Sequence, residues 1–178
     1  IHVEDQEFPK KCGFFEGKAV IPQEEMSQKI RAALDARTDP DFVVIARCDA
    51  YAVTGWTDTV ARCRAYIEAG ADIVFVDGIK TQDDLGRYAE ELPELPRMYN
   101  GDLLPTHEVA AMGFKLMICG GTIWLVYKAV HDALDELKTT GRVNPERYGT
   151  RLQVADLLGL QQVYELERKY GVSHTQAV

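Results

Sequence analysis

The sequence predicts an α/β fold in which short strands alternate with helices along one parallel sheet. Short runs of apolar and β-branched residues recur along the chain, and amphipathic stretches with helical spacing separate them. No low-complexity segment or linker interrupts this alternation. We therefore expect strands over residues 1–4, 42–46, 72–76, 96–99 and 114–118, each followed by a helical connection.

The connecting segments contain signals for the beginning and end of helices. A helix over 23–36 is expected to stop before Pro40, because the residue that precedes a proline avoids the helical conformation. A helix over 57–69 is expected to end at Gly70, which tolerates the left-handed conformation. Further helices are expected over 83–92, 106–112, 122–139 and 150–170, with a polar turn over 141–148.

Two architectures fit this series of strands. Parallel strands with similar crossovers occur in doubly wound open sheets and in eight-stranded barrels. Composition does not choose between them. No Gly-x-Gly-x-x-Gly follows a strand and no Gly-x-x-x-x-Gly-Lys-Ser/Thr occurs, which weakens a nucleotide-binding version of the open sheet.

The composition excludes several classes of protein. With 178 residues, 46% apolar and 27% charged, the chain is globular rather than disordered or fibrous. Its 20 Lys and Arg against 28 Asp and Glu give a net charge of -8, the wrong sign for binding nucleic acid or anionic membranes. The uncharged stretch 116–127 is too short to span a membrane. Four cysteines without a Cys-x-x-Cys pair, and no secretion signal, predict reduced thiols in a cytoplasmic protein.

Polar residues follow each predicted strand, where the reactive groups of parallel α/β proteins collect. We expect them to form a shared polar site, although solvated loops and helix caps would also account for them. They are Glu4 and Asp5, Arg47 and Asp49, Asp77, Asn100 and Asp102, and the pair Gly120 and Gly121.

Arg47 and Asp49 lie two residues apart and therefore share one face of a strand. The Arg fork could bind a substrate carboxylate while the acid holds it in place, or the two could form a simple ion pair. Cys48 points to the opposite face and is expected to pack. The glycines of Gly120-Gly121-Thr122 expose backbone N–H groups before a helix, which suits an anion, or they permit close packing.

Cys12 lies in Lys10-Lys11-Cys12-Gly13 after the first strand. The two ammonium groups favour the thiolate, so Cys12 is a candidate acid, base or nucleophile; an inert small apolar residue is the alternative. Cys63 is expected in the core, and Cys119 is left open. The four histidines show no metal spacing, and His131 and His174 are expected to be structural or exposed. The apolar stripe of the last helix, between residues 152 and 166, predicts burial against a partner subunit.

Three strings occur in order at the strand ends, and together they are specific. They are Ile1-His2-Val3-Glu4-Asp5-Gln6, Lys10-Lys11-Cys12-Gly13 and Ala46-Arg47-Cys48-Asp49-Ala50. The chain thereby resembles the isocitrate lyase and phosphoenolpyruvate mutase superfamily, and most closely its carbon–carbon lyases of the methylisocitrate lyase and dimethylmalate lyase type. The resemblance extends to residues 69–72 and to residues 157–165.

The resemblance implies a TIM-type (β/α)8 barrel. Residues 1–140 would form its C-terminal part, about five βα units that correspond to strands four to eight. Residues 141–178 would form a helical extension that packs on a partner subunit, because the C-terminal helices of this family often exchange between subunits. A homo-oligomer, a dimer of dimers, is the implied assembly.

The resemblance also implies a reaction. Mg²⁺ would bind a small 2-hydroxy di- or tricarboxylic acid, which retro-aldol cleavage converts to an α-keto acid and a second carboxylate. Cys12 would protonate the departing enolate from a loop that also contains Lys10 and Lys11. An oxaloacetate hydrolase or decarboxylase of the same superfamily is the alternative within the family. A non-catalytic half-barrel that binds or assembles is the alternative outside it.

Individual positions take roles from the resemblance. Arg47 would bind a substrate carboxylate, and Glu4 would bind the metal through water, with the direct metal ligands on earlier strands. The other implied substrate contacts are Gly13, Asp77, Asn100, Gly120 and Gly121.

The sequence departs from the family pattern at three points. Phe14 stands where the lyases usually have His, which removes a polar contact and leaves the exact substrate open. Asp77 stands where Glu is common, so the reach of the carboxylate is shorter. The metal-binding aspartates belong to strands that this sequence lacks, and five strands cannot close the barrel. We therefore expect the chain to belong to a longer polypeptide or to be a cleaved form.

Overall fold

The structure, a computed structural model, describes residues 1–13 and 15–171. The expectations about Phe14 and His174 lie outside the described residues. Two compact units make up the chain, Ile1–Gly121 and Thr122–Val178. The division expected after residue 140 stays a prediction, because compactness within one chain does not define where a barrel ends.

The first unit contains one parallel sheet whose strands follow the order of the chain. The strands are β1 (His2–Glu4), β2 (Ile45–Cys48), β3 (Ile73–Val76), β4 (Arg97–Asn100) and β5 (Leu116–Ile118). A doubly wound sheet reverses its strand order at a switch point, whereas a barrel continues in one direction. The order β1-β2-β3-β4-β5 therefore favours the barrel type of the two architectures.

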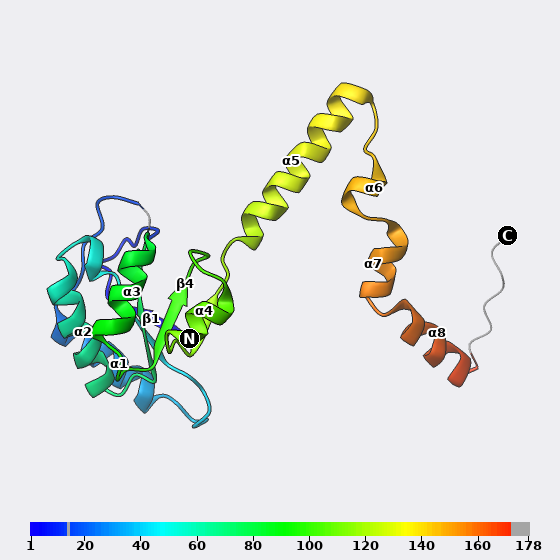
Figure 1. Cartoon of the computed structure of the whole chain (residues 1–178). Coiled ribbons are helices and arrows are strands. Elements are labelled where there is room, and N and C mark those ends of the chain that lie inside the picture. The colour runs from blue at the N-terminus through cyan, green and yellow to red at the C-terminus, as the bar shows by residue number, and fades with distance from the viewer. Residues whose placement is uncertain (14, 172–178) are drawn as a thin grey trace. The chain divides into compact units, whose positions relative to one another are not determined.

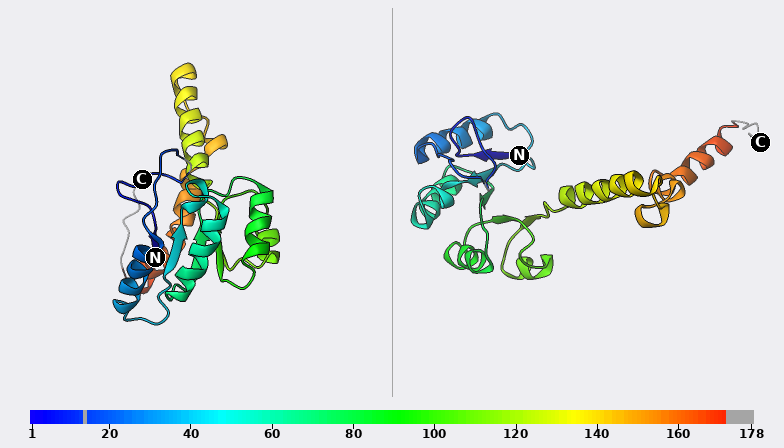
Figure 2. Two further views of the ribbon diagram at one scale, coloured as in Figure 1. Left: turned by 90° about the vertical axis from the view of Figure 1, so that its left-hand side faces the viewer. Right: turned by 90° about the horizontal axis from the view of Figure 1, so that it is seen from above.

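Helices connect successive strands and lie along one side of the sheet (Figures 1 and 2). The sequence predicts all four of them to within a residue or two at each end. Glycine at position 70 has a φ of 105°, so it ends the second connection as expected. The helices are α1 (Gln23–Asp35), α2 (Trp56–Glu68), α3 (Gln82–Glu91) and α4 (Thr106–Ala111), and a 3-10 turn, η1 (Ala50–Ala52), follows β2.

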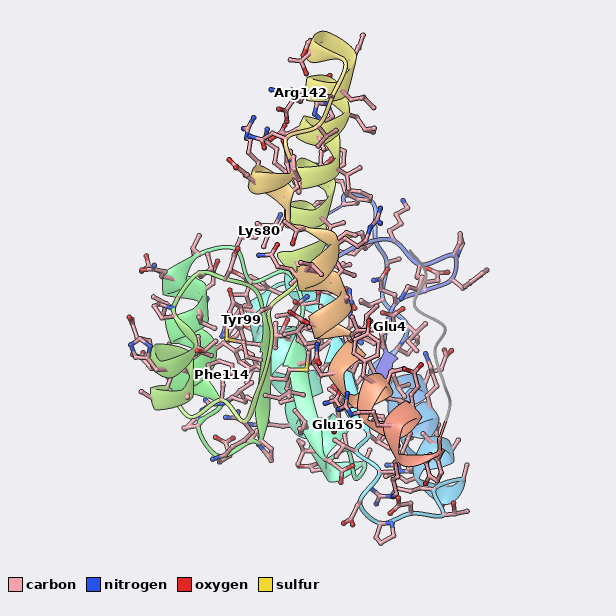
Figure 3. All side chains as sticks on the ribbon, turned by 90° about the vertical axis from the view of Figure 1, so that its right-hand side faces the viewer. Glu4, Lys80, Tyr99, Phe114, Arg142 and Glu165 are labelled. Carbon is pink, nitrogen blue, oxygen red and sulfur yellow. The ribbon has the colours of Figure 1, made fainter. Side chains whose placement is uncertain are left out.

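Alternate residues of each strand face opposite sides of the sheet. One side packs against the helices and forms the larger core, in which Tyr99 meets Phe114 edge-to-face at a centroid distance of 6.2 Å (Figure 3). The other side has a smaller apolar cluster of Ile45, Phe75 and Met98. Strands that bury both faces are typical of parallel sheets.

The second strand differs from its prediction. It begins at Ile45, and the preceding Phe42 and Val43 are 45% and 41% exposed. Pairing with β1 begins at His2 and Ile45, so the apolar residues before Ile45 lead into the strand without joining the ladder. As a consequence Arg47 lies inside the strand and Asp49 directly after it.

The second unit begins with α5 (Thr122–Thr140), close to its expected bounds. The expected polar turn contains the short helix α6 (Pro145–Tyr148), because Asn144 accepts a hydrogen bond from the Glu146 N–H and caps it. The expected last helix is two helices, α7 (Arg151–Leu157) and α8 (Leu160–Lys169). Gly159, with φ 80° and ψ 34°, is left-handed and interrupts them.

The helices of the second unit bury none of their described residues within this chain. His131 on α5 is exposed, in agreement with the sequence. Leu157 and Leu158 are also exposed, and burial of this stripe by a partner stays a prediction. Among the described residues, no helix combines the length and the apolar character that crossing a membrane requires.

Candidate active site

Arg47 occupies the centre of a charged cluster at the ends of β1, β2 and β3. The strand register places it between Glu4 of β1 and Phe75 of β3. Ala46 and Cys48 pack in the core beneath the helices, so Arg47 projects to the opposite side of the sheet. Glu4 ends β1 (Figure 3). The cluster is therefore on the face that would line the inside of a barrel.

Three carboxylates surround the Arg47 guanidinium. Its Nε donates to Asp49 Oδ2 and its Nη2 donates to Asp49 Oδ1, both at 2.8 Å. Nη2 lies 3.1 Å from Asp77 Oδ2, and Nε lies 3.4 Å from Glu4 Oε2. Burial lowers the pKa of Arg47, but the hydrogen bond and charge of Asp49 and the charges of Asp77 and Glu4 outweigh it and raise that pKa.

The expected arrangement of Arg47, Cys48 and Asp49 is confirmed. Arg47 and Asp49 bond on one face, and Cys48 is buried on the other, against the helices. Cys63 is also buried, as expected. The ion pair with Asp49 is compatible with both interpretations of Arg47, as a ligand for a substrate carboxylate and as one half of a simple ion pair. No hydrogen bond to its Nη1 is found within residues 1–13 and 15–171, so that nitrogen can donate to a ligand.

Asp77 is a buried acid whose two oxygens are not both satisfied. Its Oδ2 lies within ion-pair distance of Arg47 but has no aligned hydrogen bond. Burial raises the pKa of Asp77, and the neighbouring Asp49 raises it further, whereas Arg47 and Lys18 lower it. A buried polar atom without a hydrogen bond is uncommon in native proteins and is a candidate ligand contact.

Gly13 packs directly against the Asp77 carboxylate. A Cβ placed on Gly13 would lie 1.4 Å from Asp77 Oδ2, so no side chain fits at this position without a shift. The loop that contains Cys12 therefore reaches the end of β3 through its backbone.

Gln6, which sequence reasoning did not select, fixes the loop to the cluster. Its Nε2 donates to Lys11 O at 2.9 Å and to Asp49 Oδ1 at 3.0 Å, and the Lys11 N–H donates to its Oε1 at 2.8 Å. Gln6 ends the string that carries the family resemblance, which is the signal that could have identified it.

The loop side chains take different directions. Lys10 forms an ion pair with Glu4 at 2.8 Å, whereas Lys11 Nζ donates to Gly17 O at 2.7 Å and so turns to the loop itself. The Cys12 side chain is exposed, as is that of Cys119. Cys12 is therefore anchored near the cluster through its neighbours, and its side chain is open to solvent.

Lys18 is the second residue that sequence reasoning missed. Its Nζ donates to Gly13 O at 2.7 Å and lies 3.5 Å from Asp49 Oδ1. Nothing in the local sequence marks this lysine, because its position depends on how the loop folds back.

Asp5 directly follows β1, as expected, but it does not join the shared polar site, so that part of the expectation is wrong. Asp5 is 0% exposed and faces α2, where its Oδ2 accepts from Tyr66 Oη at 2.7 Å and from Arg62 Nη1 at 3.3 Å. Its Oδ1 accepts the Asp49 N–H at 2.7 Å. Burial raises the pKa of Asp5, although the hydrogen bonds from Asp49 and Tyr66 oppose this. Asp5 therefore holds the backbone beneath the site.

Asn100 and the glycine pair form a separate group at the ends of β4 and β5. A Cβ on Gly120 would lie 3.3 Å from Asn100 Oδ1, and one on Gly121 would lie 3.9 Å from Asp102 Oδ2. The hydrogen bonds and ion pairs of the described residues do not connect this group with Arg47. The structure thus brings together only part of the expected site.

The carboxylates of the cluster do not fit a magnesium site by themselves. In the described part of the chain, no group of three or more His, Cys, Asp or Glu side chains is arranged to hold a metal ion. Glu4, Asp49 and Asp77 are all paired with cationic side chains. The role of Glu4 as a metal ligand through water stays a prediction.

Comparisons with known proteins identify the family to which the chain belongs. The model of the phosphoenolpyruvate phosphomutase family matches residues 1–138. The chain belongs to this family. Over 180 residues it is 37% identical to 2,3-dimethylmalate lyase of Eubacterium barkeri, covering 96% of this chain and 62% of that protein. Over 100 residues it is 44% identical to 2-methylisocitrate lyase of Salmonella typhimurium, covering 56% of this chain and 34% of that protein.

Solved structures of the family share the fold. Oxaloacetate acetylhydrolase in complex with 3,3-difluorooxalacetate matches with a TM-score of 0.86 and 31% identity, over 97% of this chain and 61% of that one. For 2,3-dimethylmalate lyase, the TM-score is 0.84 and the identity 28%, over 99% of this chain and 62% of that one. The predicted fold class is therefore confirmed: the sheet and helices are part of a TIM-barrel enzyme fold. The chain spans less than two thirds of these relatives.

Proposed function

We propose that the protein is a carbon–carbon lyase that cleaves a small 2-hydroxy di- or tricarboxylic acid to an α-keto acid and a second carboxylate. The observation that supports this most is the Arg47 guanidinium beside the loop that contains Cys12. Asp49 holds this guanidinium, and its Nη1 has no hydrogen bond to the residues that the structure describes. A fixed guanidinium binds a substrate carboxylate strongly and with a defined orientation. The relatives 2,3-dimethylmalate lyase and 2-methylisocitrate lyase support the reaction class.

In this proposal the residues of the cluster, and the separate group of Asn100, Gly120 and Gly121, have distinct tasks. Arg47 binds a carboxylate of the substrate through Nη1, and Asp77, Asn100, Gly13, Gly120 and Gly121 contact the rest of it. The hydroxyl group releases its proton to solvent and its oxygen becomes the keto oxygen of the α-keto acid. The carbon–carbon bond breaks, and its electron pair remains on the carbon beside the second carboxylate. The Cys12 thiol then protonates that carbon, and Lys10 and Lys11 supply positive charge to the loop. Cys12 is exposed in the free chain, so its thiol is accessible to a bound substrate.

Magnesium dependence is a further part of the proposal. Phosphonopyruvate hydrolase, a related structure with a TM-score of 0.80 and 28% identity, is in complex with oxalate and Mg²⁺. Of the residues described for this chain, Glu4 is the candidate ligand through water. Direct ligands would have to come from outside the cluster. For this reason no step above is assigned to the metal ion.

Hydrolysis of oxaloacetate is the second candidate reaction. It is favoured by the structural similarity to oxaloacetate acetylhydrolase, whose TM-score of 0.86 is slightly above that of 2,3-dimethylmalate lyase at 0.84. Both reactions place a dicarboxylate on a fixed guanidinium, so the substrate rather than Arg47 distinguishes them.

A substrate panel tests the proposal. The intact protein is incubated with 2,3-dimethylmalate, 2-methylisocitrate and oxaloacetate, with Mg²⁺ or with a chelator, and the products are identified by mass spectrometry. Release of pyruvate from either of the first two supports the lyase. Oxalate and acetate from oxaloacetate support the hydrolase instead. No turnover of any substrate, with the fold intact, favours the non-catalytic half-barrel.

Assembly as a homo-oligomer is proposed separately. The exposed apolar side chains of α5, α7 and α8, such as Trp124, Leu157 and Leu158, support burial against another subunit, with the extension 141–178 swapped between subunits. Sedimentation of the intact protein tests this: a tetramer is expected for a dimer of dimers, and a monomer would contradict it.

A further inference from the structure

Lys18 lies between the Cys12 loop and the ends of the strands. Its side chain is only 3% exposed, which is unusual for a lysine and requires partners for the ammonium group. Its Nζ donates to Gly13 O at 2.7 Å, so one bond joins Lys18 to the residue that follows Cys12.

The same ammonium group reaches two carboxylates of the cluster. Nζ lies 3.5 Å from Asp49 Oδ1 and 3.9 Å from Asp77 Oδ2. Asp49 belongs to the end of β2 and Asp77 to the end of β3, so Lys18 links the loop to both strands. Arg47 also pairs with both acids, and the two cations together oppose the charge of this carboxylate pair.

The backbone on either side of the loop is fixed. Gln6 and Val20 form an antiparallel bridge, and the Glu7 N–H donates to Ala19 O at 2.9 Å. Lys18 is next to this closed base, so its side chain extends from an anchored position. The Gly13 carbonyl that it holds belongs to the far side of the loop, where Gly13 meets Asp77.

We propose that Lys18 is a positioning residue, which holds the Cys12–Gly13 segment against the Asp49 and Asp77 carboxylates so that Cys12 stays within reach of the substrate. This proposal rests on the proposed lyase function. Lys18 does not act on the substrate itself; it acts through Gly13 O and the two acids. Loss of its side chain removes the hydrogen bond to the loop and leaves Arg47 as the cation that pairs with both acids.

The expected effect is on turnover rather than on substrate binding. Arg47 keeps its bidentate bond to Asp49 without Lys18, so the carboxylate site is preserved. A loosened loop, by contrast, places the proton donor in its working position less often. A displacement of about 1 Å in a catalytic group can reduce the rate roughly 100-fold.

The test compares Lys18→Met with Lys115→Met in the intact protein. Lys115 is exposed and directly precedes β5, at the opposite end of the strands, and its substitution removes the same charge. We expect Lys18→Met to lower kcat about 10- to 100-fold with KM changed less than about 3-fold. Lys115→Met should leave both constants unchanged. An unchanged kcat would overturn the positioning role, whether or not KM rises.

Hydrogen–deuterium exchange of the loop amides gives a second readout that does not require turnover. In Lys18→Met, the amides of residues 10–13 should exchange faster, while those of β2 and β3 keep their protection. Equal exchange in the variant and the unmodified protein would overturn the proposal. If the unmodified protein cleaves no substrate, the lyase function fails, and exchange alone still decides whether Lys18 anchors the loop.

Lys18→Gln keeps the test decisive if Lys18→Met does not fold. The Gln side chain retains a donor for Gly13 O but not the positive charge. We expect kcat to fall by less than about 10-fold relative to the unmodified protein, with faster exchange confined to the loop. Kinetics and loop exchange identical to those of the unmodified protein would contradict the proposal.

Discussion

Two ionic networks lie on opposite faces of β1 and β2, and they differ in how completely their atoms are satisfied. On the helix side, Asp5 accepts hydrogen bonds from Arg62, Tyr66 and the Asp49 N–H, so both of its oxygens are used. On the other side, Asp77 Oδ2 is buried beside Arg47 without an aligned hydrogen bond. The same two strands thus have a closed network on one face and an open one on the other.

This difference indicates which network stabilises the fold and which is available for chemistry. A satisfied buried network contributes to a unique native structure, whereas an unsatisfied group is a candidate for binding a ligand. Asp49 belongs to both networks, since its N–H bonds to Asp5 and its carboxylate to Arg47. Substitutions of Asp5 should therefore affect stability first, and substitutions around Cys12 should affect activity first.

The largest expected effect on stability is in the closed network. Asp5→Ala should lower the free energy of unfolding by about 3 kcal/mol, because it leaves the buried Arg62 without one of its two acids and the Asp49 N–H without an acceptor. Urea denaturation measures the change. Tyr66→Phe, which removes only one hydroxyl group, should cost about 1 kcal/mol. A loss below that of Tyr66→Phe would show that Asp5 does not stabilise the fold.

On the open face, Cys12→Ser should act on turnover. We expect kcat to fall about 100- to 10,000-fold, as for loss of a general acid, with a far smaller change in substrate binding. The exposed Cys12 makes little contact with the core, so the free energy of unfolding should change by less than about 0.5 kcal/mol. Steady-state kinetics with the substrate that the panel identifies measures the effect. Cys119→Ser, also at an exposed thiol, is the control, and unchanged turnover in Cys12→Ser would remove Cys12 from the acid role.

The sequence predicts which residues of a strand share a face of the sheet. Alternation along a strand placed Arg47 and Asp49 on one face and Cys48 on the other, and the structure agrees. Asp5 follows β1, as expected, but it continues the same alternation after Glu4 and so faces α2 instead of the shared polar site. The alternation was available in the sequence, but the side of the sheet that each residue faced was not.

The loop contacts could not be predicted from the sequence. Lys18 and Gln6 touch Asp49 only because the chain between them folds back on itself and closes at the bridge from Gln6 to Val20. No local spacing indicates such a contact. A similar limit applies to Gly159, because a left-handed residue inside an otherwise helical pattern depends on local packing.

Gly13→Ala tests the contact between the Cys12 loop and the open network. The added Cβ would overlap Asp77 Oδ2, so either the loop or the acid must move. Forced overpacking costs about 1 to 3 kcal/mol, and we expect most of it as lower kcat because the exposed loop moves more easily than β3. Gly86→Ala in α3, whose Cβ would meet no atom within 4 Å, should leave kcat unchanged. Kinetics and thermal unfolding of both variants distinguish the outcomes, and wild-type kcat in Gly13→Ala would show that the contact is not needed.

The smallest expected effect is a difference in pH dependence caused by Asp77. Burial and Asp49 raise the pKa of Asp77, so the native state holds this proton more tightly than the unfolded chain, whose Asp pKa is about 3.9. The contribution of Asp77 to the free energy of unfolding is therefore fully present below about pH 4 and is lost as the pH rises through the raised value.

Asp77→Asn cannot titrate, so the stability of the unmodified protein relative to this variant should fall as the pH rises through that window. Denaturation at a series of pH values measures the difference. Parallel curves would contradict this prediction, because they would mean that Arg47 and Lys18, which lower the pKa of Asp77, cancel the effects of burial and of Asp49.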